Sequence, residues 1–393
     1  MIYNETKYNR KWDTRKLRNL GDFSRGRSTH RPRNDELLYL GGGYPFVQTG
    51  DIKSANLFIE NHTQEYNKTG FSQSKLWDKG TLCITIAANI AETAILSYPM
   101  CFPDSIVGFK AYPTETSALF MHYVFAFIRL SIQQSVNGSI QDNINIDYLE
   151  NLDFKIPNKK IQDRIVSVLY ALDNKISLNN RINAELEKTA RVVYEYMFLR
   201  GKTLNTHFLS KKLSFQRGVE PGRIAYSETK TETNNIPFIR VRDLGQSPAL
   251  FISKENAKNT YCKPNDVLVA FDGSVGKMSI AMEGAYSTGI RKIKAKDSDY
   301  SDALIYFIFS SEEIQETIKK YAVGSNILHS ASSIEHLTFP WQKEKVEIFN
   351  EKVEPMYKMI VKNILENKAL TEQRDFLLPL LMNGQVTVKG GEE

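Results

Sequence analysis

The sequence contains few cysteines. Cys83, Cys101 and Cys262 are the three cysteines among 393 residues, and they are scattered, odd in number and without metal-ligand spacing. A disulfide framework uses cysteines in an even number, and a structural zinc site uses closely spaced ones. The sequence therefore predicts neither, and its cysteine usage favours a reduced intracellular compartment.

Long apolar runs are also missing. No run approaches the roughly 18 residues of a membrane-spanning helix, and residues 1–16 are too polar for a signal peptide. We therefore expect a soluble, cytoplasmic protein. With 41% hydrophobic and 24% charged residues, the composition is that of a globular chain long enough for two or three domains.

The sequence also lacks the loops of an autonomous enzyme. Gly273–Met278 resembles a phosphate loop, but it is too short and has no Ser or Thr after Lys277, so it predicts a turn between two strands. Gly41–Gly43 precedes a strand instead of opening a helix, unlike a dinucleotide-binding loop. Asn235–Phe238 lacks one proline of the Asn-Pro-Pro-aromatic loop of amino-methyltransferases. The six histidines share no spacing. We therefore predict no catalytic residues and no metal ligands.

Charge is nearly balanced. The 51 Lys and Arg against 45 Asp and Glu leave a net charge of +6. Such a mild excess permits a polyanionic partner without establishing one, since many basic proteins bind nothing charged.

What the sequence does contain is a long stretch of helical character, residues 160–200, without proline or glycine. Its apolar residues recur in steps of three and four, which predicts an apolar stripe along an α-helix. Asn179 and Asn183 interrupt that stripe. A second copy follows 184 residues later, with Asn363 and Asn367 at the same places. We expect the two helices to pair as a coiled coil.

The order of the segments predicts that this pair is antiparallel. The second helix must run back toward the first domain, which would bring Asn179 near Asn367 and Asn183 near Asn363. A polar layer of this kind costs stability but sets the register. Pro355 within the second helix predicts a kink or a late start there. The predicted coil interface comprises Ile165, Leu172, Ile176, Asn179, Asn183, Leu186, Val193, Phe349, Met356, Ile360, Asn363, Asn367, Leu370, Leu377 and Leu381.

The rest of the chain is duplicated as well. A shift of 192 brings Gly26 onto Gly218 and Phe46 onto Phe238, and the shift falls to 184 where Ile106 meets Ile290. Preserved order with a drifting offset is typical of two copies of one domain that differ in loop length. The sequence predicts two domains, 1–156 and 203–340, and two helical segments, 157–202 and 341–393. The predicted fold is α+β: two α/β domains in pseudo-two-fold duplication, separated by an antiparallel two-helix coiled coil.

Two polar loops follow the strands that begin at the shared Pro-Phe, residues 48–53 and 240–243. Arg and Gln at strand ends can reach base edges in a DNA groove, whereas Lys, Ser and backbone N–H groups hold phosphates. Asp51 and Asp243 are identical in both copies, which favours a role as turn caps.

For the residues beside these aspartates that differ between the copies, it stays open whether they read bases. Gln48 stands where the second copy has Arg240, and Gly50 where it has Arg242. The candidate DNA contacts are Arg25, Arg27, Gln48, Thr49, Lys53, Ser72, Gln73, Asn89, Gly138, Ser139, Gln141, Arg217, Arg240, Arg242, Ser274, Lys277, Arg291, Ser325 and Asn326.

Several short motifs occur in a fixed order along nearly the whole chain. They are Phe23–Gly26, Tyr44–Asp51, Phe71–Trp77, Lys263–Asp266, Gly324–Ser325 and Glu366–Pro379. With the duplication, this order resembles the specificity subunit of a type I restriction-modification system. One departure is that the first helix ends in Tyr194–Phe198 rather than in Leu-Leu-Pro, which weakens any carry-over of partner contacts there.

The resemblance implies two target recognition domains, each reading one half of a split site on double-stranded DNA. It also implies a coil that spaces them and binds two modification (methyltransferase) subunits, which restriction (motor-nuclease) subunits join. S-adenosylmethionine, and ATP with Mg²⁺ for restriction, would be bound by those partners, and no cofactor by this chain.

Two other functions compete with this interpretation. The chain could be a scaffold whose domains bind proteins and no DNA, and the salt dependence of DNA binding would distinguish the two. A catalytic fusion of methyltransferase and specificity subunit is disfavoured by the missing cofactor and catalytic loops.

Overall fold

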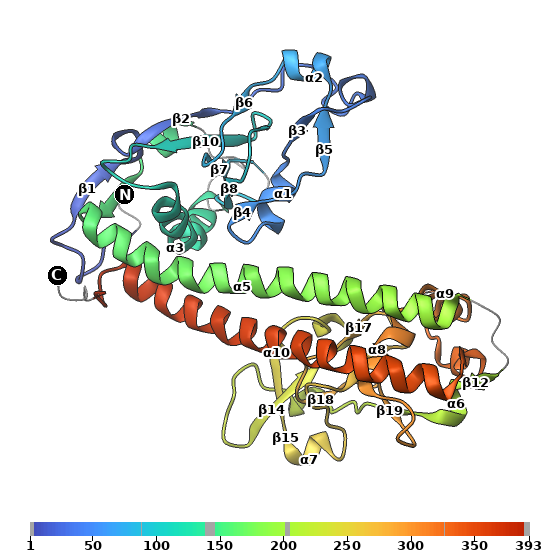
Figure 1. Cartoon of the computed structure of the whole chain (residues 1–393). Coiled ribbons are helices and arrows are strands. Elements are labelled where there is room, and N and C mark those ends of the chain that lie inside the picture. Colours follow the sequence, from blue (N-terminus) through green and yellow to red (C-terminus); the bar gives the residue numbers. More distant parts are fainter. Residues whose placement is uncertain (1–3, 88, 138–145, 201–204, 326, 389–393) are drawn as a thin grey trace. The chain divides into compact units, whose positions relative to one another are not determined.

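The computed structural model describes residues 4–87, 89–137, 146–200, 205–325 and 327–388. The chain mixes helices and strands in an α+β architecture and divides into two compact units. The first unit comprises Met1–Ser177 and Ala369–Glu393, and the second comprises Leu178–Lys368. Two long helices, α5 (Lys159–Tyr194) and α10 (Lys343–Met382), contribute a segment to each unit (Figure 1).

The first unit is built around a five-stranded sheet in the order β2-β10-β7-β8-β4. These strands are β2 (Gly21–Arg25), β10 (Ile106–Ala111), β7 (Leu82–Thr85), β8 (Thr93–Leu96) and β4 (Phe58–Ile59). A second sheet has the order β5-β3-β9-β6, with β5 (Gln64–Tyr66), β3 (Tyr44–Phe46), β9 (Met100–Cys101) and β6 (Leu76–Trp77). A ribbon of β1 (Asp13–Lys16) and β11 (Asp153–Ile156) precedes α5.

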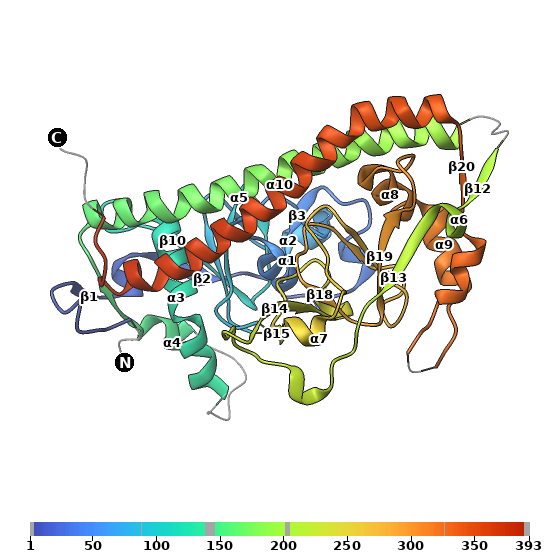
Figure 2. The same cartoon turned by 90° about the horizontal axis from the view of Figure 1, so that it is seen from below.

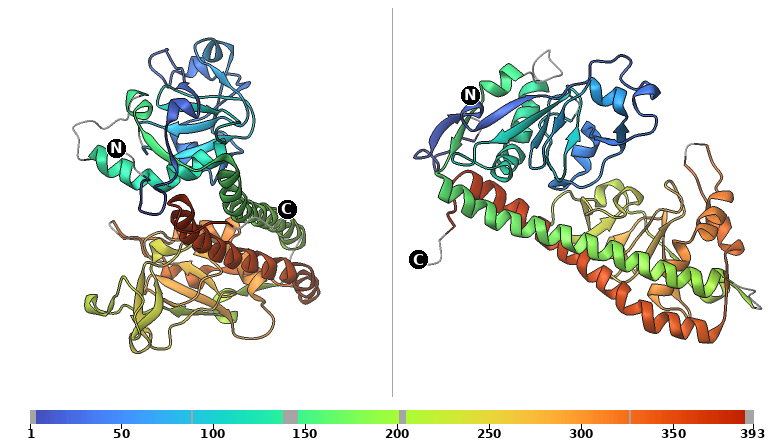
Figure 3. Two further views of the ribbon diagram at one scale, coloured as in Figure 1. Left: turned by 90° about the vertical axis from the view of Figure 1, so that its left-hand side faces the viewer. Right: turned by 45° about the horizontal axis from the view of Figure 1, so that its top comes forward.

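Strand β7 separates two apolar cores, which explains why all four of its residues are buried. Side chains alternate across a strand, so Leu82 and Ile84 join the core under helix α3 (Ala118–Asn137), and Cys83 joins the core around Trp77. Helix α3 covers one face of the five-stranded sheet (Figure 3). The remaining helices of this unit are short: α1 (Thr49–Ser54), α2 (Lys68–Ser72) and α4 (Ile146–Glu150).

The second unit repeats this plan. Its sheets have the orders β13-β19-β16-β17 and β15-β14-β18, and a β12–β20 ribbon precedes α10 (Figure 2). The strands are β12 (Thr206–Phe208), β13 (Leu213–Arg217), β14 (Asn234–Ile239), β15 (Leu250–Ser253), β16 (Val267–Ala270), β17 (Met278–Ser279), β18 (Ala285–Tyr286), β19 (Ile290–Ala295) and β20 (Thr338–Pro340). The short helices are α6 (Leu209–Lys212), α7 (Lys254–Ala257), α8 (Asp302–Phe309) and α9 (Glu312–Lys320).

Strand pairing confirms the predicted duplication. In each copy one strand pairs antiparallel with a neighbour on one side and parallel with a neighbour on the other: β3 with β5 and β9, and β14 with β15 and β18. Gly26 and Gly218 also share an environment, because each packs directly against two backbone carbonyl groups. The backbone frame is therefore common to both copies.

The two long helices pair antiparallel, as predicted. In the second unit the Asn179 side chain donates to Asn367 Oδ1 at 2.9 Å, and Asn363 donates to Asn183 Oδ1 at 2.8 Å. In the first unit Arg374 of α10 bonds Asp173 of α5. The late start predicted at Pro355 is wrong, since α10 begins at Lys343 and continues through that proline.

Candidate nucleic-acid interface

In both units a strand ends in a polar loop that an aspartate holds in place. After β3, the Asp51 carboxylate accepts the backbone N–H of Gln48 at 2.8 Å. After β14, the Asp243 carboxylate accepts the backbone N–H of Arg240 at 3.0 Å. Both aspartates are buried, and each satisfies an N–H that starts a helical turn. The predicted role of the two aspartates as caps is confirmed.

The residues beside these caps are presented differently. The exposed Gln48 side chain donates from Nε2 to Gln64 Oε1 at 2.5 Å. Arg240, at the equivalent place, turns its guanidinium onto Asp243 with bonds of 2.8 and 3.2 Å, and 24% of its side chain is exposed. Arg242 keeps 72% of its side chain exposed. The second loop therefore presents Arg242 to a ligand more fully than Arg240.

A second loop of each unit contacts the first. The turn between β7 and β8 carries Asn89, whose Oδ1 accepts from Lys53 Nζ at 3.1 Å. The turn between β16 and β17 carries Lys277, whose Nζ donates to the Arg242 backbone oxygen at 3.3 Å. That turn contains Gly273 and Gly276 at φ of 74° and 82°, so the predicted turn between two strands is confirmed. Loops far apart in the sequence thus form one polar surface in each unit.

The other predicted contacts fall into three groups. Six have exposed side chains, namely Arg25, Arg27, Ser72, Arg217, Ser274 and Ser325, while Thr49 is half-buried. Gln73 is occupied internally, because its Oε1 accepts the backbone N–H groups of Thr29 and His30. Gly138, Ser139, Gln141 and Asn326 lie outside the described residues.

Arg291 does not lie where a surface contact requires. It is 8% exposed, and its Nη1 donates to the backbone oxygens of Thr288 at 2.6 Å and Ile290 at 3.3 Å. Burial lowers the pKa of this guanidinium. Its position in β19 opposite Arg217 explains the arrangement, since two neighbouring cations are kept apart when one turns onto carbonyl groups. Arg291 is therefore buried against backbone carbonyl groups and not presented at the surface, and its predicted contact with DNA stays a prediction.

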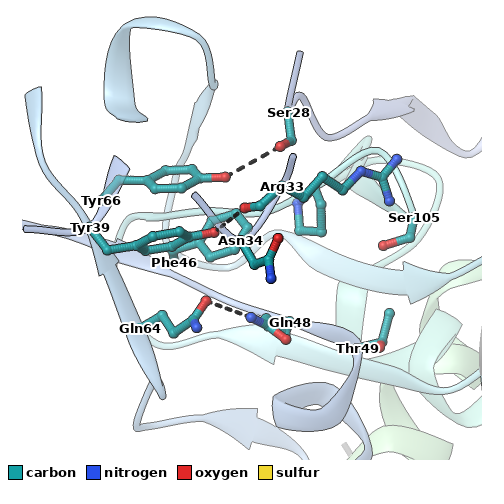
Figure 4. Close-up of a pocket in the computed structure, with 11 residues that line it drawn as sticks. Ser28, Arg33, Asn34, Tyr39, Phe46, Gln48, Thr49, Gln64, Tyr66 and Ser105 are labelled. Atoms are coloured by element: carbon teal, nitrogen blue, oxygen red, sulfur yellow. Dashed lines mark hydrogen bonds between the residues drawn. The ribbon is translucent and has the colours of Figure 1, made fainter. Parts of the chain in front are cut away.

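A cavity of about 260 Å³ opens beside Gln48 and Thr49 (Figure 4). Tilted and edge-on rings of Tyr39, Phe46 and Tyr66 form one side, with the ring centroids of Phe46 and Tyr66 4.1 Å apart. Its polar lining comprises Ser28, Arg33, Asn34, Gln48, Thr49, Gln64 and Ser105. Burial raises the pKa of Tyr39 to about 12, so its neutral hydroxyl donates to the Arg33 backbone oxygen at 2.7 Å.

Sequence reasoning missed this cavity and Gln64. Gln64 lies opposite Phe46 because β5 pairs antiparallel with β3. A register of this kind depends on tertiary packing, and the sequence signal near Gln64 is a short polar strand without alternation.

All residues of the predicted stripe lie in α5 or α10 and are buried or half-buried. Ile165, Ile176, Asn179, Phe349, Ile360, Asn363 and Leu381 are buried, and Leu172, Asn183, Leu186, Val193, Met356, Asn367, Leu370 and Leu377 are half-buried. The unusual end of α5 has a structural reason. Tyr194 and Phe198, in and after the last turn, are buried against Phe339 and Phe349 of the second unit.

A groove of about 700 Å³ lies along α10 in the second unit. Its lining residues are Lys263, Pro264, Asn265, Lys358, Val361, Lys362, Leu365 and Glu366. Three lysines against one glutamate make the groove basic, and Val361 and Leu365 make its floor apolar.

Within the described parts of the chain, no group of three or more His, Cys, Asp or Glu residues is arranged to hold a metal ion. Among those same residues, no helix has the length and apolar character needed to cross a membrane.

Comparison with known proteins agrees with this geometry. The family model described as type I restriction modification DNA specificity domain matches residues 9–188 and 218–350. The chain is 22% identical to the type I restriction enzyme HindI specificity subunit of Haemophilus influenzae, covering 93% of this chain and 98% of that protein. It is 24% identical to the MjaIX specificity subunit of Methanocaldococcus jannaschii, covering 96% and 94%.

A solved structure shows the same fold. The S subunit of a type I restriction-modification system from M. genitalium matches with a TM-score of 0.65 at 17% identity. The match covers 97% of this chain and 99% of that one.

Proposed function

Because the chain belongs to the family of type I restriction-modification DNA specificity domains, we propose that it reads a bipartite site on double-stranded DNA for such a system in the cytoplasm. The chain is a DNA-recognition component and not a catalyst. The observation that carries the proposal is the pair of polar loops capped by Asp51 and Asp243. One backbone frame presents different side chains in each copy, which suits two domains that read two different half-sites.

In the second domain Arg242 is the residue best placed to read a base. An exposed arginine at a strand end can donate two hydrogen bonds to guanine O6 and N7. Arg240 is held by two bonds to Asp243, so it positions the loop instead. Arg242→Ala should weaken binding by about 1–3 kcal/mol and relax one position of the site. An equal loss on specific and random DNA would assign Arg242 to phosphate.

Catalysis would then belong to partner subunits. We propose that two methyltransferase subunits bind this chain and that motor-nuclease subunits join through them. S-adenosylmethionine, and ATP with Mg²⁺ for restriction, would be bound by those partners.

The basic groove along α10 is our candidate surface for the methyltransferase partner. Its lysines and its apolar floor fit an acidic amphipathic segment, through charge complementarity and burial of the exposed Leu365. Lys362→Glu should weaken co-purification of the partner, while Lys352→Glu, on the same helix outside the groove, should not. Unchanged co-purification of the Lys362→Glu variant would remove the groove from the proposal.

We propose that the helix pair sets the spacing between the half-sites. Seven residues added to each helix lengthen the pair by about 10 Å, which is roughly three base pairs. The insertions belong between Ile176 and Asn179 and between Asn367 and Leu370, on the same side of the asparagine layer. A stable lengthened protein that still methylates the original spacer would contradict this role.

Sequencing of methylated adenines after co-expression with the modification subunit tests the whole proposal. We expect a split motif, and exchange of residues 205–338 for those of another family member should change one half. A scaffold that binds no DNA would yield no such motif. It would also lack the steep loss of affinity with salt that counterion release produces.

A further inference from the structure

The side chain of Gln48 is held by a second amide at the mouth of the aromatic cavity. Its Nε2 donates to Gln64 Oε1 at 2.5 Å (Figure 4). A glutamine carries one acceptor oxygen and two donor hydrogens, so this bond uses one donor. At the start of α1 Gln48 also belongs to a capping box, in which its side-chain oxygen accepts the backbone N–H of Asp51. An amide oxygen has two lone pairs, so one N–H and one lone pair of that oxygen remain for a ligand.

The Asp51 carboxylate also connects the two segments that carry these amides. Asp51 Oδ2 accepts the Gln48 backbone N–H at 2.8 Å and the Thr63 hydroxyl at 3.2 Å. Thr63 directly precedes β5, which carries Gln64. One buried carboxylate thus ties the loop of Gln48 to the strand of Gln64. The orientation of the Gln48 amide is set before any ligand binds, which lowers the entropy lost on binding.

A donor next to an acceptor on one amide matches a particular base. In the major groove adenine presents the N7 acceptor beside the N6 donor, and glutamine pairs with both at once. The thymine of the same pair presents a methyl group, which a threonine methyl can contact. Thr49 follows Gln48 directly and lines the same cavity.

We propose that Gln48, positioned by Gln64, reads an adenine in the half-site of the first domain, and that Thr49 contacts the methyl of its paired thymine. This inference rests on the proposed function. Gln64 acts as a positioning residue and touches no base itself. The second domain has no counterpart, because Arg240 at the equivalent place is bound to Asp243. The A·T reader belongs to the first half-site alone.

Binding of the full chain to defined duplexes tests the proposal. A randomised duplex library first identifies the preferred site, and anisotropy titrations follow at one salt concentration. At one adenine of the first half-site, 7-deazaadenine, which lacks the N7 acceptor, should weaken binding roughly 5- to 100-fold, the range of one bidentate contact. Uracil in place of its paired thymine should weaken binding by a smaller factor.

Protein variants separate reading from folding. Gln48→Ala should remove the response to 7-deazaadenine, and Gln64→Leu should reduce it several-fold without changing affinity for random DNA. Gln64→Glu keeps an oxygen acceptor for Gln48 Nε2 and should therefore keep the response to 7-deazaadenine. Gln246→Ala, an exposed glutamine of the second domain, is the matched control. Thermal unfolding of each variant shows whether the first domain is intact.

The outcomes distinguish the two levels of the argument. If the full chain shows no sequence preference in either half-site, the proposed function fails and this inference with it. If preference exists and survives both Gln48→Ala and Gln64→Leu, only this inference fails. An equal loss on specific and random DNA for Gln48→Ala also overturns it, because Gln48 would then contact phosphate.

Discussion

The first unit holds α5 against α10 through a buried ion pair, whereas the second unit holds the same helices through aromatic rings in addition to the asparagine hydrogen bonds. In the first unit Asp173 is 7% exposed, accepts the Tyr123 hydroxyl at 2.6 Å and pairs with Arg374 at 2.9 Å. In the second unit Tyr194 and Phe198 pack on Phe349 with ring centroids 6.0 and 5.5 Å apart.

A carboxylate of the second unit has a related but weaker arrangement. Glu187 accepts from the Tyr306 hydroxyl at 3.2 Å and pairs with Arg191 at 3.1 Å, yet 39% of its side chain is exposed. Water can replace those bonds more readily than the bonds of Asp173, whose side chain is 6% exposed. The two units therefore share the backbone frame and the helix pairing, but different side chains fill the contact between the helices in each unit.

The largest expected loss of stability comes from removing the buried carboxylate of the first unit. Asp173→Ala leaves Arg374 and the Tyr123 hydroxyl without their buried partner, and such losses cost about 3–5 kcal/mol. Glu187→Ala should cost less than about 1 kcal/mol, as exposed pairs do. Urea unfolding of the full chain gives both values. Equal losses would show that burial does not distinguish the two carboxylates.

The pH dependence of the first unit should be the next largest effect. Burial lowers the pKa of His122 to about 4, although Asp173 opposes this, and Arg374 and Arg129 lower it further. The unfolded chain, with a pKa near 6.5, takes up the proton first as pH falls. Stability from neutral His122 is thus complete above about pH 6.5 and is lost between there and about pH 4.

The loss of folding free energy should amount to at most about 3.5 kcal/mol, at about 1.4 kcal/mol per pKa unit. Hydrogen exchange of first-unit amides, measured between pH 4.5 and 7, localises it. His122→Asn keeps a polar partner for Thr93 and should make the stability of the first unit less dependent on pH. His336→Asn, an exposed histidine of the second unit, should leave it unchanged. A profile that His122→Asn does not alter would assign the acid sensitivity to other groups.

The smallest effect tests what the two units share. A methyl group added at Gly26 or at Gly218 would overlap backbone carbonyl oxygens, and overpacking of this kind costs about 1–3 kcal/mol. Gly26→Ala and Gly218→Ala should therefore destabilise their units alike. Gly50 and Gly222 have open space around them, so alanine there is the matched control. A tolerated alanine at one of the first two sites would show that the frames differ at this step.

Much of the architecture could be predicted because it depends on periodicity. The apolar steps around Asn179 and Asn183, and their repetition at Asn363 and Asn367, indicated a paired helix and its direction. The capped turns could also be predicted from local sequence: in each domain an aspartate three residues after the first loop residue, Gln48 or Arg240, caps the turn. Pro355 does not set the start of α10, which begins at Lys343, and the alternative of a kink at this proline stays a prediction.

The sequence by itself determined the duplication, the helix pairing and the two capped loops, because these follow from short-range spacing and from repeated residues. Only the tertiary structure decided which side chains of those loops are available. Arg240 and Arg242 are near neighbours in sequence and both pair with Asp243. Arg240 lies 2.8 Å from that carboxylate with 24% of its side chain exposed, whereas Arg242 lies 3.7 Å from it and is 72% exposed. Arg291 turned inward and Gln64 came to Gln48 through strand pairing. Availability depends on contacts between residues far apart in the chain, and no local pattern encodes those.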